Sequence, residues 1–155
     1  MGSTIAIEFH QKALTLDEIL GSKVGMVADY GNLGNIYETL GDLDKAIEFY
    51  QKSLALAEAL GSKEGMARDY GNLGGVYKAL GDLDKAIEFN QKALTLNEAL
   101  GRKEGMANQY FNLGSVYRLK GNKTEEKRYY EMSLELFKQL GSPNAKDVQT
   151  ELNRI

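Results

Sequence analysis

The sequence of 155 residues has no cysteine, one histidine and one proline. Without cysteine the chain forms no disulfide bond and has no thiolate chemistry, and the lone histidine, His10, has no second imidazole with which to share a metal ion. We therefore expect no metal site and no cofactor. Because the only proline is Pro143, near the C-terminus, the turns in the rest of the chain must depend on its 17 glycines.

Long apolar runs and charge clusters of one sign are absent as well. No apolar run approaches the roughly 20 residues of a membrane-spanning helix, and residues 1–3 have no signal-peptide pattern and are expected to be an expression scar. The net charge is −3 with both signs interspersed, so the sequence has no broad basic surface for nucleic acid. We expect a cytoplasmic protein, which is the default location, with no membrane or nucleic-acid partner.

The sequence is instead dominated by an internal repeat of forty residues. Residues 21–60 and 61–100 differ at eleven positions, which leaves twenty-nine of forty identical without a gap, and residues 101–140 continue the series more loosely. Apolar residues recur at helical spacing twice in each unit, so each repeat is predicted to be a pair of helices. The predicted array fills residues 4–155, with a lone second helix at 4–20, repeats at 24–60, 64–100 and 104–140, and a C-terminal helix at 143–154.

Glycines and polar caps mark the predicted helix ends. Gly41 supplies a left-handed stop and Asp44 is expected to cap the helix that follows, and the same pair recurs forty residues later. Ser142 is expected to cap the C-terminal helix, with Pro143 in its first turn. Since one helix pair cannot bury its apolar face alone, the pairs must stack. This predicts an all-α fold, a right-handed superhelical array of antiparallel helix pairs with a concave side.

The apolar and glycine pattern of each unit resembles the tetratricopeptide repeat signature, with tyrosine where that family often has tryptophan. The matching residues of the first full unit are Tyr30, Leu33, Gly34, Tyr37, Gly41, Ala46, Tyr50 and Leu54, and the match recurs in the next two units. The forty-residue period is longer than the family's usual one and is similar to that of spindle-orientation adaptors, kinesin light chains and bacterial regulatory arrays. The resemblance implies the helical-repeat fold, and it implies binding of protein partners more loosely, because function depends on the site.

Two departures from the pattern concern the ends of the array. In the last full unit Glu126 and Lys127 replace the small and apolar pair seen earlier as Ala46 and Ile47, which predicts less close helix packing there. The chain also starts with a second-type helix that lacks a preceding partner, so it looks like a fragment of a longer array.

In this family the first helix of each pair lines a concave groove, so the resemblance implies a peptide-binding site there. Eight residues of this sequence are the candidates: Asn32, Asn35, Arg68, Asn72, Lys78, Asn108, Asn112 and Arg118. Asn32, Asn72 and Asn112 form a ladder whose amides offer both a donor and an acceptor to the backbone of an extended ligand. The simpler alternative is that duplication copied a surface asparagine that only caps or hydrates its helix.

The charges near this ladder bear on the choice of ligand. Arg68, Lys78 and Arg118 favour an acidic segment through charge-assisted hydrogen bonds, although ordinary solvated helix charges explain them equally well. The carboxylate clamp of the family's chaperone adaptors is not expected, since Asn108 and Asn112 stand where that clamp has basic residues.

Several glycines and the single histidine occupy positions that need an explanation. Gly31, Gly71 and Gly75 should each cost about 1 kcal/mol relative to alanine, and a groove kept open for close approach of a ligand backbone would explain them. Gly34 and its equivalents are expected to pack against a small residue of the second helix. His10 stands at a position that is tyrosine one unit later, so we expect it to be a packing residue rather than a catalytic one.

The sequence therefore favours a protein- or peptide-binding scaffold that uses its concave groove, and not an enzyme, because no phosphate loop or nucleophile motif is present. One alternative is a structural array that self-associates through its end helices, which near-identical repeats and unpaired apolar ends would favour. Another is a regulatory segment of a larger protein.

Overall fold

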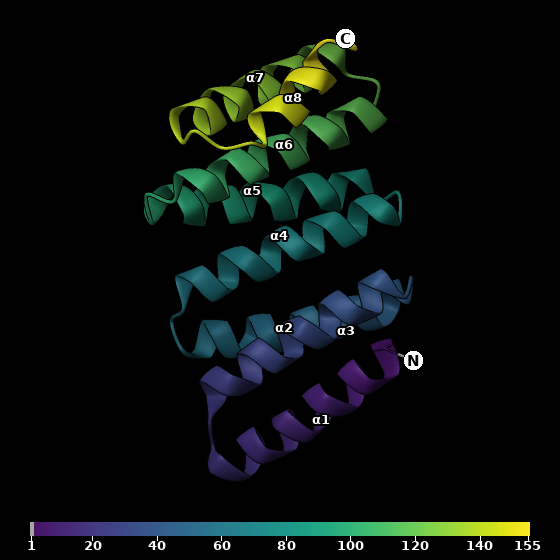
Figure 1. The fold of residues 1–155 in the computed structure, drawn as a ribbon, viewed down its shortest axis with the longest axis vertical. Helices are drawn as coiled ribbons and strands as arrows, with labels where there is room; N and C mark the ends of the chain where they lie inside the picture. The colour runs from purple at the N-terminus through teal and green to yellow at the C-terminus, as the bar shows by residue number, and fades with distance from the viewer. Residues whose placement is uncertain (1) are drawn as a thin grey trace.

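The computed structural model describes residues 2–155, which form eight α-helices and no strand. The helices run back and forth across the long axis of the molecule and stack along it from the N-terminal to the C-terminal end (Figure 1). This confirms the predicted all-α array of helix pairs. Met1, the first residue of the predicted scar, lies outside the described residues. The helices are α1 Gly2–Leu20, α2 Lys23–Thr39, α3 Leu43–Ala59, α4 Lys63–Ala79, α5 Leu83–Ala99, α6 Lys103–Leu119, α7 Lys123–Gln139 and α8 Ala145–Leu152.

The turns between the helices confirm the predicted glycine stops. A glycine with a φ between 63° and 79° follows each of α1 to α7, which is a backbone conformation that other residues rarely adopt. The predicted cap at Asp44 was wrong, because α3 begins at Leu43 and Asp44 already lies in its first turn. Asp42 caps α3 instead, and its carboxylate accepts a hydrogen bond from the Lys45 N–H at 3.2 Å.

The C-terminal helix is shorter than predicted and starts later. Ser142 and Pro143 precede it in a turn, where the N–H groups of Ala145 and Lys146 bond to the carbonyls three residues before them. Asn144 is therefore the N-cap residue of α8, and it makes no side-chain cap bond. Because the chain passes through this tighter turn first, Pro143 lies before the helix rather than inside its first turn.

Within each pair the two helices meet at a glycine on the first helix. The prediction that a small residue of the second helix packs against this glycine was wrong. A methyl group on Gly34 would lie 2.5 Å from the ring of Tyr50, which is fully buried. Gly114 meets the ring of Tyr130 in the same way. In these two pairs the glycine makes room for a large aromatic ring, and in the middle pair Gly74 makes room for the amide of Asn90, which lies 2.6 Å from the position of such a methyl group.

Aromatic stacking also holds the pairs together, including the last full one. Tyr37 stacks on Phe49 with ring centroids 5.3 Å apart, and Tyr117 stacks on Tyr129 at 5.5 Å. Glu126, which raised the expectation of looser packing, is buried. The substitution therefore does not separate α7 from α6.

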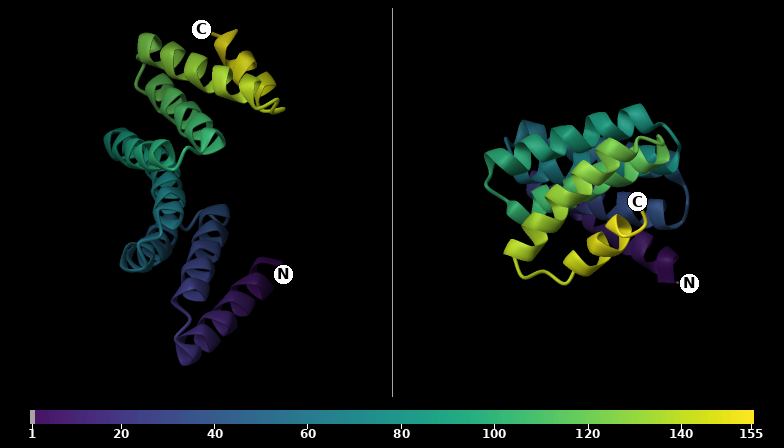
Figure 2. Two further views of the ribbon diagram at one scale, coloured as in Figure 1. Left: turned by 90° about the vertical axis from the view of Figure 1, so that its left-hand side faces the viewer. Right: turned by 90° about the horizontal axis from the view of Figure 1, so that it is seen from above.

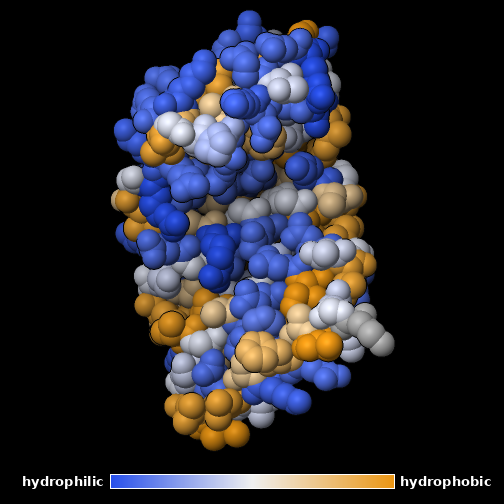
Figure 3. All heavy atoms as spheres, in the orientation of Figure 1, coloured by the Kyte–Doolittle hydropathy of each residue, from blue (hydrophilic) through white to orange (hydrophobic). Residues whose placement is uncertain are grey.

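The stack of helices is curved. Its two ends project to the same side, and the middle of the array, α4 and α5, lies at the back of the arc (Figure 2). The first helices of consecutive pairs, α2, α4 and α6, contact one another directly, so they form the inner side of the curve. In the orientation of Figure 3 this hollow side faces the viewer, and mostly hydrophilic atoms occupy its middle.

Candidate functional site

Three cavities follow one another along the inner side of the curve. The first lies between α2 and α4 and has a volume of about 400 Å³, and the central cavity lies between α4 and α6 with about 320 Å³. The third lies between α6 and α8 with about 180 Å³. Arg68 and Arg102 line both of the first two cavities, and Asn108 lines both of the last two. The three cavities therefore form one continuous surface, which we call the inner groove.

The central cavity is the most polar part of the inner groove. Its lining combines two arginines, five side-chain amides and three small residues: Arg68, Arg102, Asn72, Asn97, Asn108, Gln109, Asn112, Ala67, Gly71 and Gly105. Within residues 2–155, the amides of Asn72, Asn108 and Asn112 have no hydrogen-bond partner. Each of these three amides can therefore offer one acceptor and two donor hydrogens to a ligand.

Buried polar groups hold Arg68 at the edge of this cavity. Its Nε donates to the Asp69 carboxylate at 3.0 Å, and one Nη donates to the Ser53 hydroxyl at 3.2 Å. Burial raises the pKa of the Asp69 carboxyl, while the bonds from Ser53 and Arg68 act in the opposite direction. The other oxygen of Asp69 has no partner, so Arg68 and Asp69 are joined by a single hydrogen bond rather than by a bidentate pair.

Arg102 lines the same two cavities as Arg68 and lies at the N-cap position, directly before α6. Its guanidinium lies 3.7 Å from a carboxylate oxygen of Glu64, whose side chain is 72% exposed. An ion pair of this length between exposed side chains contributes little stability and is easily exchanged for another anion. The Arg102 guanidinium is therefore available to a ligand.

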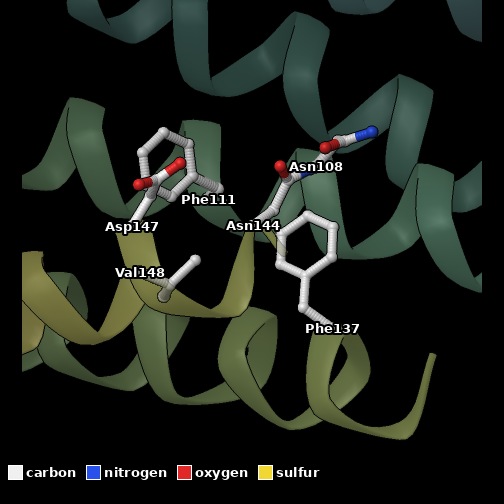
Figure 4. A pocket seen from close by; sticks show the side chains of 6 residues that line it. All are labelled: Asn108, Phe111, Phe137, Asn144, Asp147 and Val148. Carbon is white, nitrogen blue, oxygen red and sulfur yellow. The ribbon is translucent and has the colours of Figure 1, made fainter. Parts of the chain in front are cut away.

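The third cavity has a different character (Figure 4). The rings of Phe111 and Phe137 form its walls, and Asn108, Asn144 and Asp147 lie around them, with Val148 at the base. An apolar slot with a polar edge suits a single side chain rather than a charged group. The inner groove therefore changes along its length from basic and amide-rich to apolar.

A model of the tetratricopeptide repeat matches residues 3–59 and 65–139 of the sequence. The chain belongs to the tetratricopeptide repeat family. Repeats of this family generally mediate protein–protein interaction, and the proteins that contain them are generally non-catalytic scaffolds.

Several solved structures share this tetratricopeptide fold. BtubC (BKLC) from P. vanneervenii is 22% identical with a TM-score of 0.83, and the match covers 98% of this chain but only 65% of that chain. A putative kinesin light chain of Podospora anserina with nearly identical repeats is 19% identical with a TM-score of 0.78, over 98% of this chain and 76% of that one. The N-terminal domain of stress-induced protein-1 from C. elegans is 19% identical with a TM-score of 0.67, over 85% of this chain and 98% of that one. These identities show the fold alone, and no curated protein sequence matches the chain.

Four of the eight predicted groove residues of this tetratricopeptide array meet in one place. Arg68, Asn72, Asn108 and Asn112 line the central cavity together. Asn32 is exposed on α2 and lines none of the three cavities. The predicted ladder of asparagines is therefore uneven, and its members on α4 and α6 are the ones that lie next to charged groups.

Asn35 lies apart from the central cavity and already has a partner. The hydroxyl of Tyr50 lies 2.7 Å from the Asn35 amide oxygen and also 2.7 Å from the Glu38 carboxylate. Burial and the hydrogen bond to Glu38 raise the pKa of Tyr50. Asn35 instead borders a separate cavity of about 310 Å³ between α1 and α2.

The last two predicted residues, Lys78 and Arg118, lie at the other end of the inner helices. Burial lowers the pKa of the Lys78 ammonium, and the positive charge of Arg118 lowers it further. Arg118 itself forms an ion pair with Glu151 of α8. These two side chains do not line the three cavities, and Arg118 ties the terminal helix to the array.

The expectation that Gly31 and Gly71 keep the groove open was wrong. A methyl group on Gly31 would lie 3.4 Å from the Arg68 guanidinium, and one on Gly71 would lie 2.9 Å from the Gln109 amide nitrogen. The space over each glycine is taken by a side chain of the following inner helix. Gly31 and Gly71 therefore make room for side chains of the next repeat, although Gly71 also lines the central cavity. Gly75 differs, because only a Glu38 oxygen comes within 4 Å of the corresponding position, at 3.8 Å.

Three polar lining residues were missed by the sequence analysis: Asn97, Arg102 and Gln109. Each departs from its equivalents in earlier repeats, since Arg102 replaces Ser62 and Gln109 replaces Asp69. Comparing repeats for such departures would have found them.

His10 lies 2.8 Å from Asp29 on α2, and the described residues hold no cluster of three or more His, Asp or Glu side chains that fits a metal ion. Among residues 2–155, no helix is long and apolar enough to cross a membrane.

Proposed function

We propose that this tetratricopeptide array is a non-catalytic scaffold that binds an extended segment of a partner protein along its inner groove. The observation that carries the proposal is the central cavity, where the free amides of Asn72, Asn108 and Asn112 face the groove beside two guanidinium groups. A carboxamide matches both the N–H and the C=O of a peptide backbone, so neighbouring amides bind an extended chain with little demand on its sequence. The basic groups favour an acidic segment.

The test is a peptide selection followed by matched substitutions. A displayed library of random peptides is selected against the immobilised chain, and the affinity of the selected peptide is then measured by fluorescence anisotropy. The Asn72→Ala, Asn112→Ala double variant should weaken binding by at least about tenfold, the equivalent of one or two lost hydrogen bonds. Asn32→Ala is the matched control, because Asn32 has the same place in its repeat but lines none of the three cavities.

Two results would contradict this proposal. One is a selected peptide whose affinity is the same for the double variant and the wild type while circular dichroism shows both to be folded. The other is an equal loss for Asn32→Ala, because it would place the peptide outside the central cavity.

A second candidate function is self-association, and the outer surface of α1 favours it. Ile5, Phe9 and Ile19 are 67%, 67% and 77% exposed, and hydrophobic atoms gather at this end of the molecule (Figure 3). At the opposite end α8 exposes polar side chains such as Lys146 and Gln149. The two ends therefore do not match each other, and two copies would pair α1 against α1 in a closed dimer rather than stack into a filament.

Sedimentation equilibrium over a concentration series tests this pairing. The wild type should dimerise, and the Phe9→Lys, Ile19→Lys double variant should remain a monomer. Leu80→Lys is the control, because Leu80 is 48% exposed but lies at the end of α4, away from α1. A wild type that stays monomeric at every concentration would rule out the dimer in solution.

A further inference from the structure

The first turn of α6 lacks the cap that the equivalent helices have. Ser22 and Ser62 stand before α2 and α4, and their hydroxyls accept hydrogen bonds from the N–H groups of Gly25 and Gly65 at 3.3 and 3.2 Å. Before α6 this position is Arg102, whose side chain makes no cap hydrogen bond. A guanidinium only donates, so it cannot accept from a backbone N–H.

This uncapped helix end opens on the central cavity. Gly105, whose N–H corresponds to the capped ones of Gly25 and Gly65, lines the cavity together with Arg102 and Arg68. Free N–H groups and the positive end of the helix dipole attract an anion, and guanidinium groups bind carboxylates through paired hydrogen bonds. The missing cap therefore coincides with the most basic part of the inner groove.

A buried acceptor in the same cavity indicates what else the ligand carries. Gln109 lines the cavity with only 8% of its surface exposed, and its amide oxygen has no hydrogen-bond partner among the described residues. The equivalent Asp69 accepts from Arg68, and Asp29 lies 2.8 Å from a ring nitrogen of His10. An unpaired buried acceptor is costly, and rotation of the Gln109 amide away from Gly71 would bring this oxygen to an N–H of a ligand.

We propose that this cavity is an anchoring site for an aspartate or glutamate side chain in the bound peptide. The peptide carboxylate caps α6 at the Gly105 N–H and lies between Arg102 and Arg68, and a neighbouring N–H group of the peptide donates to Gln109. Because both arginines also line the first cavity, the groove continues on each side of this point. The carboxylate is therefore that of a side chain within the peptide and not that of its C-terminus. Glu64, which is exposed, leaves Arg102 when the ligand binds.

The anchoring site rests on the proposed peptide binding, but it can be tested without a selected peptide. In a ¹⁵N–¹H spectrum the chain is titrated with N-acetyl-aspartate amide, which has a single side-chain carboxylate. The Gly105 resonance should shift saturably towards lower field, and that of Gly65 should not, because Ser62 already caps it. N-acetyl-asparagine amide, which has the same shape without the charge, should leave Gly105 unchanged.

The Arg102→Ser variant is the matched test in the protein. It restores the hydroxyl found at Ser22 and Ser62, so it should remain folded and lose the titration. For an acidic peptide from the selection, Arg102→Ser should weaken binding at least about tenfold, and replacing the peptide's acid by its amide should have no further effect in this variant.

Several outcomes would overturn the anchoring site. They are a Gly105 resonance that does not move, an equal shift with the asparagine compound, or unchanged binding by Arg102→Ser. Tighter binding of N-acetyl-glycine, which has only a terminal carboxylate, would show that the site takes a chain end. If the selected peptide depends on Asn72 and Asn112 but not on Arg102, the groove function stands without the anchor. If no peptide is selected but Gly105 titrates, the anion site stands without the groove function.

Discussion

Two glycines three residues apart on α2 should respond to alanine in opposite directions. At Gly34 a methyl group would lie 2.5 Å from Cε1 and 2.6 Å from Cδ1 of Tyr50, a fully buried ring with no room to move. At Gly31 the nearest atom is a terminal nitrogen of Arg68 at 3.4 Å, which is an ordinary van der Waals distance. The helix preference of alanine over glycine is the same at both sites. The neighbouring side chains therefore decide whether alanine raises or lowers the free energy of unfolding.

The magnitudes follow from two opposing effects. Alanine is better than glycine in a helix interior by about 1 kcal/mol, and Gly31→Ala should gain most of this. Overpacking a rigid core costs about 1–3 kcal/mol, and a 2.5 Å contact with a buried ring belongs in the upper part of this range, so Gly34→Ala should lose about 1–2 kcal/mol after the helix gain is subtracted. For a chain of this size each kcal/mol corresponds to roughly 2–4 °C in Tm.

Urea and thermal unfolding followed by circular dichroism would measure both effects. A double-mutant cycle provides the control, because in a Tyr50→Leu background the ring is gone and the penalty of Gly34→Ala should largely disappear. A Gly34→Ala variant as stable as the wild type, or a penalty that is unchanged without the ring, would contradict the clash with Tyr50.

Three further predictions concern stability. Arg102→Ser should raise the free energy of unfolding by about 1 kcal/mol in urea titrations, because it supplies a missing N-cap. Since burial raises the pKa of Asp69, the folded state binds its proton more tightly than the unfolded state. The stability of the wild type relative to Asp69→Asn should therefore fall as the pH rises from about 4 through the raised pKa, and a constant difference would refute this. Tyr50→Phe should cost about 1 kcal/mol of unfolding free energy, because it removes the hydroxyl from Asn35 and Glu38; a variant as stable as the wild type would show that these contacts contribute nothing.

Local features of the sequence were sufficient for most of the helix boundaries. The glycines at the helix ends and the helical spacing of apolar residues act within a few residues, so they could be interpreted without the fold. The errors at Asp44 and Ser142 were shifts of two residues, because the geometry of the preceding turn decides at which residue a helix begins.

The candidate site could be predicted only in part. The sequence identified the inner helices and four of the residues that line the central cavity, since a fixed position in each repeat faces the same side. It did not show that Asn35 is paired with Tyr50, because that bond joins two helices. It also did not indicate that Lys78 and Arg118 lie outside the cavities.

The sequence by itself determined the repeat, the helix pairs and the stacking, because these depend on a periodic pattern of apolar residues and glycine. Only the tertiary structure decided which side chains meet between repeats. Arg68 lies over Gly31, Gln109 lies over Gly71, and Arg102 faces the same cavity as Arg68 although it is far away in sequence. The curvature of the stack sets these contacts, and curvature arises from the packing of whole helices rather than from any local pattern.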